Sequence, residues 1–138
     1  MTEQKKQVQR FYEQLWNAHD TTVAEAILHA DIAFRGSLGL EKRGRREVVA
    51  YVDMVHAALD EYRCIIDDWI EEGQKLCAWM TFTGIHRGTF LGFAPTHQRV
   101  TWAGCAWFTF SGDKIASLQV LGDIDGLRRQ LQGSVQGS

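Results

Sequence analysis

The stretch that decides the fold lies in the last third of the chain. Residues 99–110 read RVTWAGCAWFTF, residues 111–113 read SGD, and residues 114–122 read KIASLQVLG. Two apolar runs of strand length joined by a short glycine-containing segment predict an antiparallel hairpin, because glycine supplies the positive φ that such turns need. The second run is followed by Asp123, and residues 124–131 have the spacing of a short amphipathic helix.

The remaining elements are read outward from this hairpin. Strands are predicted at residues 63–71 and 75–86, and a brief strand at 31–35. Apolar residues recur at helical spacing over residues 3–18, 22–29 and 46–59. Helices followed by a mostly antiparallel sheet indicate an α+β fold, with the N-terminal helices lying on one curved sheet and a pocket between them. We expect a single domain over residues 1–132 and a flexible C-terminal tail over residues 133–138.

Composition narrows the function classes. The 138 residues carry 15 basic and 17 acidic side chains, so no net field attracts nucleic acid. No segment has the ~18 apolar residues that a membrane span needs, and residues 1–6 do not open a signal peptide. Cys64, Cys77 and Cys105 are odd in number and widely spaced, which argues against a disulfide framework or a zinc site and suits a reducing cytoplasm. We expect no metal and no cofactor, because the chain has neither an HExxH-like motif nor a nucleotide-binding glycine pattern.

Asp123 is the first candidate for a catalytic group. A carboxylate after so apolar a strand is costly to bury, and burial favours its protonated form, the property that a general acid/base needs near neutrality. The other interpretation is that Asp123 caps the helix over residues 124–131 by accepting backbone N–H groups.

Strand alternation gives the candidate pocket residues. In the last strand Gln119 shares a face with Ser117 and Asp123, so it can reach a ligand oxygen. The corresponding faces of the neighbouring strands carry Trp79 and Trp107, and we expect these faces to line the pocket unless a bulge shifts them.

Three sequence patterns at these spacings resemble one known family. They are Gly84-x-His86-x-Gly88-x-Phe90-x-Gly92-x-x-Pro95-Thr96, Gly112-Asp113-Lys114-Ile115, and Asp123-x-x-Gly126-Leu127-x-x-Gln130-Leu131. Together with Phe11-Tyr12 and Trp16-Asn17, they look like the SnoaL-like polyketide cyclases, or predicted ester cyclases, of the nuclear transport factor 2-like superfamily. The resemblance spans nearly the whole chain.

The resemblance implies a cone-shaped α+β barrel, in which a curved antiparallel sheet wraps a long helix, and a pocket without a cofactor. It also implies an aspartate as general acid/base in an intramolecular aldol ring closure, and the matching position is Asp123. The surroundings depart from the family, because Leu118-Gln119 replaces a frequent His-Trp pair and Phe34-Arg35 replaces an expected polar residue. The departures weaken any claim to the known polyketide substrates.

Two further side chains have open roles. Arg35 is either a buried cation that pairs with Asp123 or a substrate carboxylate, or an exposed loop residue. His86 is either a structural residue that hydrogen-bonds the following turn or a donor in the pocket.

The sequence therefore supports two functions. The first is an enzyme in which Asp123 removes a proton α to a carbonyl of a small hydrophobic compound, with Gln119, Arg35 or His86 donating to the developing oxyanion and Trp79 and Trp107 walling the pocket. The second is a binding protein of the same fold that holds a hydrophobic metabolite without converting it. The apolar content of 45% makes a homodimer the expected assembly under either function.

Overall fold

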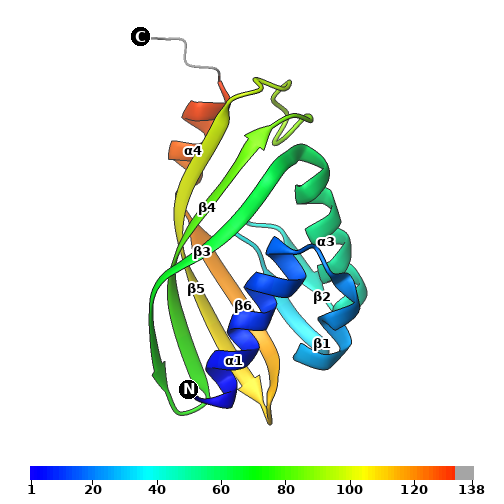
Figure 1. The fold of residues 1–138 in the computed structure, drawn as a ribbon, viewed down its shortest axis with the longest axis vertical. Coiled ribbons are helices and arrows are strands. Elements are labelled where there is room, and N and C mark those ends of the chain that lie inside the picture. The colour runs from blue at the N-terminus through cyan, green and yellow to red at the C-terminus, as the bar shows by residue number, and fades with distance from the viewer. Residues whose placement is uncertain (133–138) are drawn as a thin grey trace.

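The computed structural model describes residues 1–132 and is built on one curved six-stranded sheet (Figure 1). The strand order is β2-β1-β6-β5-β4-β3, and every neighbouring pair is antiparallel except β1 with β6. The strands are β1 (Leu28–Arg35), β2 (Glu41–Arg43), β3 (Leu59–Glu72), β4 (Lys75–His86), β5 (Arg99–Ser111) and β6 (Lys114–Gly122). The expected α+β class is therefore confirmed, and the sheet is curved but does not close into a barrel.

Both predicted hairpins form. In each, a two-residue turn joins the strands, and Gly73 and Gly112 adopt the positive φ values of 59° and 64° that these turns require. The sequence missed β2, whose three residues carry no apolar alternation.

The helices are α1 (Glu3–Arg10), η1 (Phe11–Asn17), η2 (Thr21–Val23), α2 (Ala24–Ile27), α3 (Arg45–Ala58) and α4 (Ile124–Leu131). Figure 1 shows α1 and α3 on the same side of the sheet. Their apolar sides pack with the inner face of the sheet into one hydrophobic core. At the other end of the chain, α4 covers the edge of β5 beyond the end of β6, where Gln130 bonds both the N–H and the C=O of Thr101.

The first helix differs from the expected continuous α-helix over residues 3–18. After Arg10 it widens into the π-helix η1, which buries two pairs of adjacent apolar residues, Phe11-Tyr12 and Leu15-Trp16. Asn17 ends it by pairing with the backbone of Cys64 in the edge strand β3, through bonds of 2.9 and 2.7 Å. π-Helical turns are rare in proteins, and those that do occur often lie at functional sites.

A β-bulge in β6 reverses the expected facing of the last strand. Phe110 lies opposite Ile115, but Thr109 lies opposite Ser117, so Ala116 is an extra residue. Beyond the bulge, Leu118 and Val120 point into the core, and Ser117, Gln119 and Leu121 point away from it. Strict alternation would put Gln119 on the same face as the buried Ile115, and the bulge puts it on the opposite face.

Within the described residues, no helix is long and apolar enough to cross a membrane. The tail over residues 133–138, which the sequence predicts to be flexible, lies outside the described residues.

Candidate functional site

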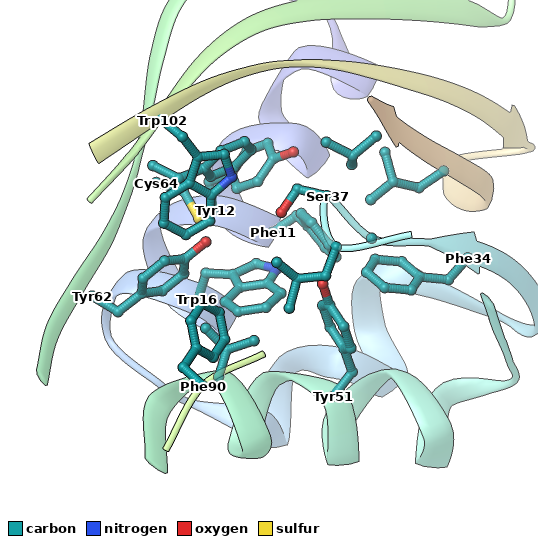
Figure 2. A pocket seen from close by; sticks show the side chains of 16 residues that line it. Phe11, Tyr12, Trp16, Phe34, Ser37, Tyr51, Tyr62, Cys64, Phe90 and Trp102 are labelled. Atoms are coloured by element: carbon teal, nitrogen blue, oxygen red, sulfur yellow. The ribbon is translucent and has the colours of Figure 1, made fainter. Parts of the chain in front are cut away.

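The candidate site is an apolar cavity between η1, α3 and the inner face of the sheet (Figure 2). The volume available to the centre of a water molecule is about 20 Å³, enough for one water. Its sixteen lining residues are Phe11, Tyr12, Trp16, Phe34, Gly36, Ser37, Leu38, Tyr51, Val55, Tyr62, Cys64, Phe82, Phe90, Trp102, Leu118 and Val120. None of these is an acid, a lysine, an arginine or a histidine.

Hydroxyl, thiol and indole groups supply the polarity of the cavity. Burial raises the pKa of Tyr12 and of Tyr62 well above the usual value of 10.0. Burial also raises the pKa of Tyr51 to about 12, against the lowering effect of hydrogen bonds with the backbone of Leu38 and the side chain of Ser37. The pKa of the Cys64 thiol is raised by burial too. The cavity therefore holds neutral hydrogen-bonding groups and no charge near pH 7.

Two of these polar groups have no partner. The Tyr12 hydroxyl and the Trp102 indole Nε1 are buried and make no hydrogen bond in the described structure, and the two residues are 2% and 3% exposed. Figure 2 shows Trp102 on the cavity wall above Tyr62. Buried donors without partners are unusual in folded proteins and call for a physical reason.

Two loops close the cavity. One is the 36–40 connection, where a Cβ on Gly36 would collide with the ring of Tyr51, so only glycine fits there. The other is the 87–98 segment, which reaches the cavity with Phe90. Phe90 and Phe93 exchange backbone bonds of 3.0 and 2.9 Å around a turn in which Leu91 has a φ of 52°.

His86 fastens the 87–98 segment. Its side chain is fully buried, and Nδ1 accepts a hydrogen bond from the backbone N–H of Thr96 at 3.2 Å. Burial lowers the pKa of His86 below 6.5, so the neutral form is favoured. His86 is not among the lining residues of the cavity, and its contacts match the structural interpretation rather than that of a pocket donor.

Asp123 is not among the lining residues of the cavity. It is the N-cap of α4, its side chain is exposed, and Oδ1 accepts the Gly126 N–H at 3.0 Å. The preceding residue, Gly122, packs on the wall, because a Cβ there would lie 3.2 Å from Ser37 and 3.4 Å from Trp102. Asp123 thus follows a residue that packs against two lining residues, Ser37 and Trp102, and in this rotamer its carboxylate caps α4.

The other predicted pocket residues lie on the opposite face of the sheet. Trp79 and Trp107 are 56% and 49% exposed, and Gln119 is exposed as well. Arg35 lies beside a shallow outer hollow with Trp107 and Gln119, and it donates to the carbonyl of Val120 at 2.7 Å without contacting Asp123. These strand faces therefore do not line the cavity between the helices and the sheet. On β4 and β5 that cavity takes the alternate residues, and in β6 the bulge puts Gln119 on the outer face.

The inner lining was not singled out from the sequence. Tyr12 and Trp16 belong to the apolar stripe of the first helix, which reads as ordinary core. Trp102 lies on the same face of β5 as Phe108 and Phe110. Because this face is apolar throughout, it could have indicated from the sequence that Trp102 points inward. Among residues 1–132, no cluster of His, Cys, Asp or Glu is arranged to hold a metal ion.

Comparisons with known proteins agree with this architecture. The sequence model of the family SnoaL-like polyketide cyclase matches residues 6–131. No curated protein sequence matches the chain. Among solved structures, TsrD from Streptomyces laurentii is 23% identical, with 96% of each chain covered and a TM-score of 0.85.

Two further structures superpose as well. A protein from Jannaschia sp. CCS1 described as a SnoaL-like polyketide cyclase is 16% identical, covering 96% of this chain and 93% of its own, with a TM-score of 0.86. IdmH from Streptomyces antibioticus, described as a polyketide cyclase, is 14% identical, covering 95% and 99%, with a TM-score of 0.82. At these identities the structures show a shared fold, and the family match over nearly the whole chain shows more: the protein belongs to the SnoaL-like polyketide cyclase family.

Proposed function

We propose that the protein is a cyclase- or isomerase-type enzyme that performs cofactor-independent acid/base chemistry on a small hydrophobic carbonyl compound. The observation that supports this most is the small, uncharged cavity with buried hydrogen-bond donors in its wall, set in a SnoaL-like fold. Such a site holds an apolar molecule and stabilises charge on an oxygen that develops during reaction.

The proposed reaction begins with Asp123. Asp123 rotates away from Gly126 and takes a proton from the carbon α to the carbonyl, so the C–H bond breaks and its electrons form an enolate whose oxygen stays inside the cavity. The enolate carbon then attacks a second, ketone carbonyl carbon of the same folded substrate, a polyketide-like ester for instance. The new C–C bond forms as the π bond of that carbonyl breaks, and its electrons become an alkoxide on the carbonyl oxygen. The protonated Asp123 gives its proton to this alkoxide, so no group leaves and the carboxylate is regenerated. The cavity contributes the folded conformation of the substrate.

A second function is favoured by one specific observation. Asp123 is exposed and accepts a hydrogen bond from its own helix, which is the contact of a capping residue. A non-catalytic protein that binds a small hydrophobic metabolite needs the cavity but not a free carboxylate.

The Asp123→Asn variant separates the two functions. Asparagine caps a helix as well as aspartate does, so the variant loses the base and keeps the fold. Acetophenone has enolisable methyl protons, and their exchange for deuterium is followed by ¹H NMR in D₂O. If the protein is an enzyme, we expect it to accelerate this exchange. The acceleration by Asp123→Asn should be smaller by a factor of at least about 100.

The matched control is Asp125→Asn, which removes an exposed carboxylate two residues further on that pairs only with Arg129. This control should exchange acetophenone protons at the rate of the unmodified protein. Acetophenone that binds without faster exchange contradicts the enzymatic proposal and favours the binding protein.

We propose in addition that the outer face of the sheet pairs with a second copy of the chain. Trp79, Trp107 and Leu121 expose 56%, 49% and 71% of their surface there, and large exposed apolar side chains that gather on one face are typical of an interface. A two-fold dimer buries the same patch of both copies.

A further inference from the structure

The cavity contains two polar groups that the fold itself does not use. Most of its wall is aromatic or aliphatic, and phenylalanine occupies four of its positions, Phe11, Phe34, Phe82 and Phe90. Phenylalanine would also fill the place of Tyr12 without burying a hydroxyl. The Tyr12 hydroxyl and the Trp102 Nε1 nevertheless stand unpaired among these rings, at a cost to the free energy of folding.

The other polar groups of the cavity are different. The Tyr51 hydroxyl interacts with the Leu38 backbone and the Ser37 side chain. The Tyr62 hydroxyl interacts with the Cys64 thiol. Among the lining residues, the Tyr12 hydroxyl and the Trp102 Nε1 are the polar side-chain atoms that are fully buried without a hydrogen-bond partner.

The chemistry of the two groups defines the occupant. An indole N–H is only a donor, and a phenol is a donor or an acceptor, so a ligand oxygen with lone pairs satisfies both. The lining has no cation, so an anionic ligand would be buried there without a counter-charge, which is costly. The lining has no carboxylate either, so a cationic ligand meets the same penalty.

We propose that the Trp102 Nε1–H and the Tyr12 hydroxyl are the anchors that hold the oxygen of an uncharged, mainly apolar carbonyl ligand in this cavity. The inference rests on the proposed function in that the cavity is the substrate site. It adds the residues that bind the oxygen and excludes carboxylates, phosphates and amines as substrates. During enolisation the same two donors face the oxygen on which negative charge develops.

A ligand needs more room than the space for about one water that the cavity offers in this structure. The 87–98 segment can supply it, because it has no helix or strand and places only Phe90 over the cavity. The base of the segment is fixed by the Arg87 and Gly88 N–H groups, which both donate to the carbonyl of Ala58 at 3.0 Å. Displacement of the Phe90 turn therefore opens the cavity while the base of the segment stays in place.

The test uses three probes of nearly equal shape. Acetophenone carries the carbonyl oxygen, α-methylstyrene replaces that oxygen with a methylene, and benzoate replaces the methyl group with a charged oxygen. Binding is followed by ¹H–¹⁵N correlation spectra, in which the five tryptophan indole groups give separate signals and Trp102→Phe assigns one of them. We expect acetophenone to bind at least about fivefold more tightly than α-methylstyrene and to shift the Trp102 indole signal. Benzoate should not bind measurably.

The variants Tyr12→Phe and Trp102→Phe keep an aromatic ring and remove the polar group. Each should bring the affinity ratio of acetophenone to α-methylstyrene close to one, with a melting temperature that is unchanged or higher. Trp107→Phe on the outer face is the matched control and should keep the full ratio. It also tests the sequence-based expectation that Trp107 lines the pocket.

Three results would overturn the proposal. The first is equal binding of acetophenone and α-methylstyrene to the unmodified protein, and the second is a ratio that survives in both anchor variants. The third is no binding of any probe together with lower melting temperatures in the variants, which would assign the two groups to an internal water. Deuterium exchange at acetophenone is a separate readout: selective binding without exchange contradicts the enzyme and leaves the anchors supported.

Discussion

Asn17 holds together the two walls of the cavity. Its side chain donates to the Cys64 carbonyl at 2.9 Å and accepts from the Cys64 N–H at 2.7 Å. The helix that Asn17 ends contributes Tyr12 to the lining, and the strand that it reaches contributes Tyr62 and Cys64. We therefore predict that Asn17→Ala both destabilises the protein and loosens the site.

The magnitude follows from the two bonds. Each contributes about 1 kcal/mol net, and a backbone group left unpaired costs about 1–3 kcal/mol depending on how well water replaces the partner. Asn17 is half-buried and adjoins an open groove along β3, so water reaches part of the vacated site. We expect a loss of about 2–3 kcal/mol in the free energy of unfolding.

The assay is urea denaturation followed by tryptophan fluorescence. Gln14→Ala is the control, because Gln14 is an exposed residue of the same helix, and it should change the free energy of unfolding by less than about 0.5 kcal/mol. Acetophenone affinity, measured in parallel, should fall in Asn17→Ala. A loss below about 0.5 kcal/mol in Asn17→Ala would refute the reasoning, since the two short bonds would then carry no net stability.

Two other predictions concern pH and assembly. Burial lowers the folded-state pKa of His86 below 6.5, so the unfolded chain binds the proton first and stability falls as the pH drops below 6.5. The free energy of unfolding should therefore decrease between pH 7.5 and 5.5, and this group contributes at most about 1.4 kcal/mol per pH unit. The decrease should be smaller in His86→Gln. Equal pH dependence of the free energy of unfolding in the two proteins would contradict this. For the dimer, light scattering during size-exclusion chromatography should give twice the monomer mass for the unmodified protein. The Leu121→Arg variant should have the monomer mass and an unchanged circular dichroism spectrum. The same mass for both proteins would count against the outer-face interface.

The sequence by itself determined the elements that depend on local physics. The period of apolar residues located α3 and α4 to within one residue, and the glycine turns located both hairpins, because these signals act between residues close in the chain. The motif spacings identified the family, and the capping interpretation of Asp123 followed from the helix that begins after it.

Only the tertiary structure decided which residues form the cavity. The bulge at Ala116 turns Gln119 outward. This bulge lies in the part of β6 that pairs with β5 on one side and with β1 on the other. Trp79 and Trp102 both lie within strands of alternating pattern, so the sequence does not distinguish them. Which of the two faces the core depends on the side of the sheet on which the helices pack. The lack of a partner for Trp102 and Tyr12 emerges only when every neighbour is in place, because a hydrogen bond depends on atoms that lie far apart in the chain.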